Sequence, residues 1–134
     1  MNYTITDDIK KLPLAAVMAL LAQTYWADTR TPEQVQLSMD NSRCYGVYLN
    51  DSKALVGFAR VISDFATTYY LCDVVIDREH QHRGLGVALV SHIESLPEYQ
   101  GLRGILITRD AHTLYEKFGY QTLNGRAMVK GLNC

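Results

Sequence analysis

The residues of this chain whose spacing most directly suggests chemistry form one short segment, Gln81-His82-Arg83-Gly84-Leu85-Gly86. This segment, the glycine turn, separates an apolar run ending at Ile76 from a helical pattern. Glycine lets the backbone approach a ligand closely. Unpaired N–H groups at the start of a helix bind anions, and the helix dipole adds to the attraction. The glycine turn therefore predicts a site for a phosphate-bearing ligand.

Three classes of phosphate ligand compete for such a turn. A mononucleotide P-loop requires Lys-Ser or Lys-Thr after its last glycine, and neither dipeptide follows here. A dinucleotide-binding turn requires a third glycine, but Leu89 stands at that position. Residues 77–83 also separate the strand from the first glycine. These departures favour a pyrophosphate held by a longer loop.

A second pattern lies downstream, Ala111-x-x-Leu114-Tyr115-x-x-x-Gly119-Tyr120. Together with Gln81-x-x-Gly84-x-Gly86, in this order and with a strand between them, it resembles the acetyl-CoA motif and the closing motif of the GNAT N-acetyltransferases. The match covers residues 43–120, and the two helices expected before it suit the variable substrate lid of that family.

The resemblance implies acetyl-CoA as co-substrate, without a metal. Backbone groups of Val74, Val75 and Ile76 would bind the pantetheine arm and polarise the thioester carbonyl. The pyrophosphate would be held by backbone N–H groups of the glycine turn, that is Gln81, His82, Arg83, Gly84, Leu85 and Gly86.

Two further positions follow from the resemblance. Tyr115 would protonate the leaving CoA thiolate, with a plain core aromatic as the alternative. Thr108 stands where the family often has an asparagine that contacts the cofactor, and its hydroxyl can still form a hydrogen bond.

The acceptor side is less defined. Many family members carry a Glu or His base on the fourth strand, where this chain offers only Asp73; a water-relayed base and a structural role are the alternatives. The aromatic and charged turn with Tyr25, Trp26, Asp28 and Arg30 either lines an acceptor pocket or packs between helices. Arg60 and Asp64 either face the same cleft or pair with each other.

The patterns of apolar and turn-forming residues predict the elements that position these groups. Helices are expected over residues 13–22, from a Thr31-Pro32 start past Met39, over 84–96, and over 110–118 with Asp110 as cap. Strands are expected over residues 43–49, 54–62, 67–76 and 102–107, with short ones over 120–123 and 126–129. Because strand 67–76, helix 84–96 and strand 102–107 form a βαβ unit, these two strands should be parallel.

The predicted fold is α/β in the broad α+β sense: one domain, residues 1–134, with a mixed, mostly antiparallel sheet, helices on both faces and a central parallel βαβ unit. A length of 134 residues suits one domain, and a net charge of -1 argues against a general nucleic-acid or membrane-surface role. Three cysteines without a CxxC pair argue against a disulfide framework or zinc cluster and favour the cytoplasm. The apolar stretch after Lys11 is interpreted as a buried helix and not as a signal peptide.

The function expected from these observations is acetyl transfer from acetyl-CoA to a primary amine, by direct attack. The alternatives are a non-catalytic acyl-CoA-binding module on the same fold and transfer of a different acyl group. The acceptor is a small-molecule or peptide amine, and a homodimer is left open.

Overall fold

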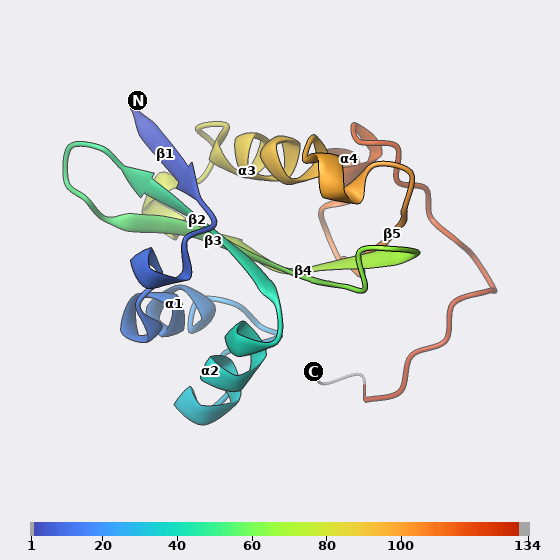
Figure 1. Ribbon diagram of the computed structural model, residues 1–134, viewed down its shortest axis with the longest axis horizontal. Coiled ribbons are helices and arrows are strands. Elements are labelled where there is room, and N and C mark those ends of the chain that lie inside the picture. The colour runs from blue at the N-terminus through green and yellow to red at the C-terminus, as the bar shows by residue number, and fades with distance from the viewer. Residues whose placement is uncertain (1, 132–134) are drawn as a thin grey trace.

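A computed structural model describes residues 2–131 (Figure 1). A five-stranded sheet in the order β1-β2-β3-β4-β5 forms its centre. All neighbouring strands are antiparallel except β4 and β5, which are parallel. The strands are β1 (Tyr3–Thr6), β2 (Arg43–Leu49), β3 (Leu55–Ser63), β4 (Thr68–Ile76) and β5 (Arg103–Ile105). The predicted mixed sheet with a parallel βαβ unit is therefore confirmed, whereas β1 was not predicted.

Helices cover both faces of the sheet, as Figure 1 shows. The helices α1 (Leu14–Leu21) and α2 (Pro32–Asp40) pack on one face, where Phe58 and Val75 are buried. On the other face lie α3 (Leu85–Glu94) and α4 (His112–Glu116). The buried side of α3 is Leu85, Leu89, Val90 and Ile93, which matches its 3.6-residue period. Short 3-10 turns occupy Ile9–Lys11, Arg78–His80 and Pro97–Tyr99.

The ends of two helices differ in how well the sequence predicts them. At the start of α2, Thr31 and Gln34 form the expected capping box, with Pro32 in the first turn. At the start of α4, the prediction that Asp110 caps the helix is wrong. Ala111 takes that place because the turn before it is closed by Thr108, whose Oγ1 accepts a hydrogen bond from the Ala111 N–H at 3.0 Å.

The edge of the sheet at β5 is shorter than the pattern predicted. Only Thr68–Tyr70 of β4 pair with β5, so β4 runs on to Ile76 without a strand on that side within residues 2–131. The predicted strands over 120–123 and 126–129 are wrong, because the structure places residues 121–131 in an irregular, exposed segment (Figure 1). The apolar side chains of Leu123, Met128 and Val129 are exposed and do not form part of the core. Short strands without a partner and a buried face are not stable.

Candidate active site

The glycine turn presents a row of unpaired backbone donors. Gly84 adopts a left-handed conformation with φ of 83°, which ends the loop and starts α3. In the part of the chain that the structure describes, no N–H group from Gln81 to Gly86 donates a hydrogen bond. A Cβ at Gly84 would have no described atom within 4 Å, and one at Gly86 would meet only Ile76 Cγ1 at 3.7 Å. The turn is thus open to an anion.

Side chains hold the loop before the glycine turn in place. Gln81 Nε2 donates to the Ile76 carbonyl at 3.0 Å, which ties the turn to the end of β4. Gln23, just after α1, donates to Asp77 Oδ1 at 3.1 Å and accepts from the Arg78 N–H at 3.0 Å. Sequence reasoning missed Gln23, since nothing near it in the chain indicates a contact with residues 77 and 78.

A β-bulge interrupts β4 beside its free edge. Arg60 pairs with Cys72 and Phe58 with Val75, so Asp73 and Val74 together oppose the single residue between them on β3. Asp73 has a φ of 54°, in the left-handed region that few side-chain-bearing residues adopt. Bulges re-aim side chains and bend strands. Here the bulge turns Asp73 into the α1–α2 face, next to the backbone of residues 74–76.

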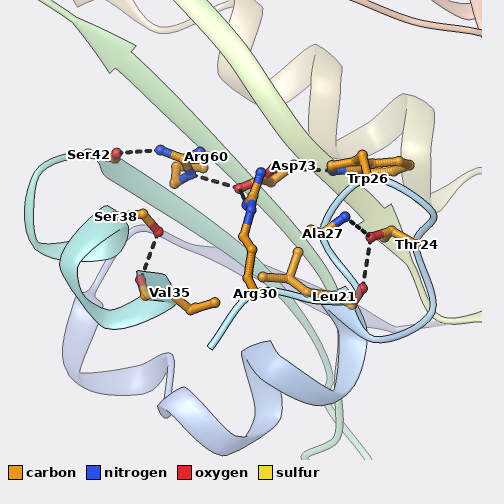
Figure 2. A network of polar contacts seen from close by, with 10 residues as sticks. All are labelled: Leu21, Thr24, Trp26, Ala27, Arg30, Val35, Ser38, Ser42, Arg60 and Asp73. Carbon is orange, nitrogen blue, oxygen red and sulfur yellow. Dashed lines mark hydrogen bonds and ion pairs between the residues drawn. The ribbon is translucent and has the colours of Figure 1, made fainter. Parts of the chain in front are cut away.

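Figure 2 shows three side chains converging on Asp73. Its Oδ2 accepts from Arg30 Nη1 at 2.7 Å and from Arg60 Nε at 2.8 Å, while its Oδ1 accepts from Trp26 Nε1 at 3.2 Å. We call Trp26, Arg30, Arg60 and Asp73 the Asp73 cluster. Burial alone would raise the pKa of Asp73, but the hydrogen bond from Arg30 and the charge of Arg60 more than offset it, so this pKa is lowered. Such a carboxylate is a poor general base at neutral pH.

The Asp73 cluster revises two expectations. Arg60 does not pair with Asp64; it pairs with Asp73, and its Nη1 donates to Ser42 Oγ at 3.1 Å. Asp64 lies in the turn between β3 and β4, where it accepts hydrogen bonds from the N–H groups of Ala66, Thr67 and Thr68. The structure therefore brings Arg60, Asp73 and Trp26 together and leaves Asp64 outside. Arg30 belongs to the turn that was predicted to take part in acceptor recognition, but its pairing with Asp73 was not predicted.

An aromatic contact joins the α1–α2 turn to the opposite loop. Tyr25 is about half exposed, and its ring stands edge-on to that of Trp26 with centroids 5.0 Å apart. The guanidinium carbon of Arg109, between β5 and α4, lies 3.7 Å from the centre of the Tyr25 ring. Sequence reasoning missed Arg109, because a lone arginine in a loop has no distinguishing pattern.

Tyr115 is buried on the α3 face of the sheet. Its ring packs against Tyr120, with centroids 6.0 Å apart. Burial raises the pKa of Tyr115 to about 12, so the phenol stays protonated at neutral pH. Its hydroxyl makes no hydrogen bond to any described residue, and its oxygen is not completely buried. The hydroxyl therefore keeps some contact with solvent and has no acceptor among the described residues.

Other features of the structure lie apart from this region. A hollow of about 510 Å³ is lined by residues of α3, β4, the segment after α3 and the residues directly after α4, including Glu94, Tyr99 and Phe118. Within residues 2–131, no three His, Cys, Asp or Glu side chains are grouped to hold a metal ion. None of the described helices is long and apolar enough to cross a membrane.

Comparison with known proteins adds independent findings. A family model described as the acetyltransferase (GNAT) family matches residues 14–120. The chain is 31% identical over 98 residues to an uncharacterized N-acetyltransferase, ycf52, of Gracilaria tenuistipitata var. liui. That alignment covers 69% of this chain and 54% of the relative, so this chain matches about half of the relative's length.

Solved structures agree. A crystal structure from Xanthomonas campestris pv. campestris, assigned to the GNAT acetyltransferases, is 36% identical with a TM-score of 0.86, over 92% of this chain and 87% of that one. A GNAT acetyltransferase from Elizabethkingia anophelis, solved with acetyl-CoA bound, shares the fold at 16% identity and a TM-score of 0.70, over 92% and 78% of the two chains.

Proposed function

The chain belongs to the GNAT acetyltransferase family, and from this we propose that it transfers the acetyl group of acetyl-CoA to a primary amine by direct attack. The observation that carries the proposal is the row of unpaired N–H groups in the glycine turn, directly beside the free edge of β4. A phosphate-bearing arm and an extended chain can bind to these two features together.

The residues present fit the co-substrate. The N–H groups from Gln81 to Gly86 and the dipole of α3 suit a pyrophosphate. The edge of β4 at Val74, Val75 and Ile76 lacks a strand neighbour among the described residues and suits an amide-bearing arm such as pantetheine, which pairs with it like a strand. Acetyl-CoA, when bound, supplies the thioester that is consumed.

The chain's own groups then have separate tasks. A backbone N–H at the bulge polarises the carbonyl that the amine attacks. As the C–N bond forms and the C–S bond breaks, the hydroxyl of Tyr115 gives a proton to the departing sulfur and is reprotonated from solvent. The proton lost by the amine passes to water, since the lowered pKa of Asp73 makes this carboxylate a poor acceptor.

Direct attack is favoured over an acyl-enzyme because the thiol near the bulge is inert. Cys72 is adjacent to Asp73, and burial raises the pKa of its thiol to about 11. A thiol is nucleophilic as the thiolate, and little thiolate is present at neutral pH.

Two measurements test the proposal. Calorimetry should show that CoA binds and that a nicotinamide dinucleotide does not. Thiol release from acetyl-CoA should then be screened against a panel of primary amines, and at least one should be acetylated. Binding of CoA without turnover by any amine would favour the non-catalytic acyl-CoA-binding module instead.

A further inference from the structure

The Asp73 cluster holds more positive than negative charge. Arg30 and Arg60 both bind the same oxygen, Oδ2 of Asp73, so two guanidinium groups share one carboxylate. Neither arginine makes another ion pair within the described residues. Their side chains are 21% and 11% exposed. One positive charge thus remains partly buried and uncompensated, and in such a setting a counter-charge is bound more strongly than at an open surface.

Both arginines also keep hydrogen-bond donors that the protein does not use. Arg60 donates from Nε to Asp73 and from Nη1 to Ser42, so its Nη2 has no partner among the described residues. Arg30 donates only from Nη1, to Asp73, so its Nε and Nη2 have no partner among the described residues. Because no described side-chain nitrogen is both buried and unpaired, each of these remaining groups keeps some contact with solvent. Adjacent guanidinium N–H groups match the two oxygens of a carboxylate.

The position of this charge connects it to the proposed reaction. Asp73 and Val74 form the bulge of β4, and the edge of the same strand is where we place the acyl carrier. Trp26 and Arg30 reach the bulge from the turn between α1 and α2 (Figure 2). An anion bound by Arg30 is therefore held close to the backbone beside which an acceptor amine must attack.

On the basis of the proposed acetyl transfer, we propose that the acceptor is a small primary amine that carries a carboxylate, in the manner of a free amino acid. Arg30 and Arg60 bind this carboxylate. A single negative charge matches the single uncompensated positive charge of the cluster. Asp73 does not touch the acceptor; it positions the two guanidinium groups.

The test compares amino acids with their C-terminal amides as acceptors, with thiol release from acetyl-CoA as the readout. A carboxylate raises the pKa of its neighbouring amine, so intrinsic reactivity at neutral pH favours the amide. A preference for the acid must therefore come from the protein. We expect kcat/KM for the favoured acid to exceed that for its amide by roughly ten-fold to a hundred-fold, the range of one or two charge-assisted hydrogen bonds.

Variants assign the preference to Arg30. Arg30→Gln should bring the acid down to the rate of the amide and leave the acetyl-CoA KM unchanged, whereas Arg30→Lys should keep part of the preference because it keeps the charge. Arg43→Gln is the matched control, since Arg43 also pairs with one carboxylate, Glu98 at 3.1 Å, but on another part of the surface. It should leave the preference intact.

Three results would overturn the inference. Equal rates for acids and amides in the wild type would reject a carboxylate-bearing acceptor while acetyl transfer itself stands, and this comparison needs no variant. A preference that persists in folded Arg30→Gln would remove Arg30 from the explanation. If no amine on the panel causes thiol release although CoA binds, the acetyl transfer is rejected and this inference with it.

Discussion

The glycine turn and the Asp73 cluster lie at the same end of β4 but are built in opposite ways. The turn presents consecutive backbone N–H groups from one stretch of chain, residues 81–86. The Asp73 cluster gathers side chains from three stretches: the α1–α2 turn supplies Trp26 and Arg30, β3 supplies Arg60, and β4 supplies Asp73.

This difference separates two kinds of recognition. Backbone N–H groups at a helix start bind phosphate through atoms of the main chain, and so they suit a co-substrate common to a whole family. A site made of side chains depends on which residues stand at each position, and so it suits the recognition of a particular acceptor. The following predictions test that division, beginning with the largest effect.

Gly86→Glu should abolish binding of CoA in calorimetry. It places a negative charge in the first turn of α3, where the pyrophosphate is expected to bind. Gly86 is preferred to Gly84 for this test, because the φ of 83° at Gly84 would strain any side chain. Gly86→Ala is the matched control, since a Cβ there meets only ordinary contact with Ile76. Unchanged affinity in a folded Gly86→Glu protein would place the phosphate elsewhere.

Tyr115→Phe should lower kcat by roughly ten-fold to ten-thousand-fold, the range for one proton-transfer group. The ring and its packing against Tyr120 are kept, so the thermal midpoint and the acetyl-CoA KM should change little. Because burial raises the pKa of Tyr115 to about 12, the wild-type hydroxyl should stay protonated, and activity should show no loss from its ionisation below that pH. Wild-type kcat in the variant would make Tyr115 a core aromatic and favour water as the acid.

The two regions also differ in how far the sequence predicts them. The glycine turn could be located because its motif is contiguous in the sequence. The bounds of β2 could be predicted because its apolar run is followed directly by turn-forming residues. The partners of Asp73 could not be identified. The alternation of residues along a strand does not predict the bulge that changes the direction of the Asp73 side chain. Arg30 also lies far from Asp73 in the sequence. The strands over 120–123 and 126–129 were predicted from local apolar residues, but strand formation also needs a partner that local pattern does not reveal.

Asp73→Asn should lower the free energy of unfolding by about 3–5 kcal/mol at pH 7, since it leaves Arg30 and Arg60 facing each other without a counter-charge. The pKa of Asp73 is lowered by folding, so its contribution is present above its unfolded pKa of about 3.9 and is lost as pH falls through its folded pKa. Urea unfolding should therefore show a difference between wild type and variant that shrinks below about pH 4.

Arg43→Gln is the stability control for this measurement. Its partner Glu98 is also a carboxylate, but both side chains are about one-third exposed or more. An exposed pair contributes about 0–1 kcal/mol. If Asp73→Asn is no more destabilising than Arg43→Gln, the Asp73 cluster does not hold the α1–α2 turn to the sheet, and its arrangement serves the ligand alone.

The smallest expected effect concerns Arg109, which joins the two sides of the site through its contact with Tyr25. An exposed cation–π contact contributes about 0.5–1 kcal/mol, equivalent to roughly two-fold to five-fold in an equilibrium constant. Arg109→Ala should therefore raise the acceptor KM by about that factor, because Tyr25 adjoins Trp26 of the Asp73 cluster. The acetyl-CoA KM should stay within error, since the glycine turn does not depend on Tyr25.

Tyr25→Leu provides the complementary variant for the Arg109 measurement, because it removes the ring and keeps an apolar side chain. Combining it with Arg109→Ala should add nothing to either single change if the two residues act only through each other. If Arg109→Ala instead raises both KM values equally, the loop between β5 and α4 serves the co-substrate as well. The division between a backbone site for the co-substrate and a side-chain site for the acceptor would then fail at this contact.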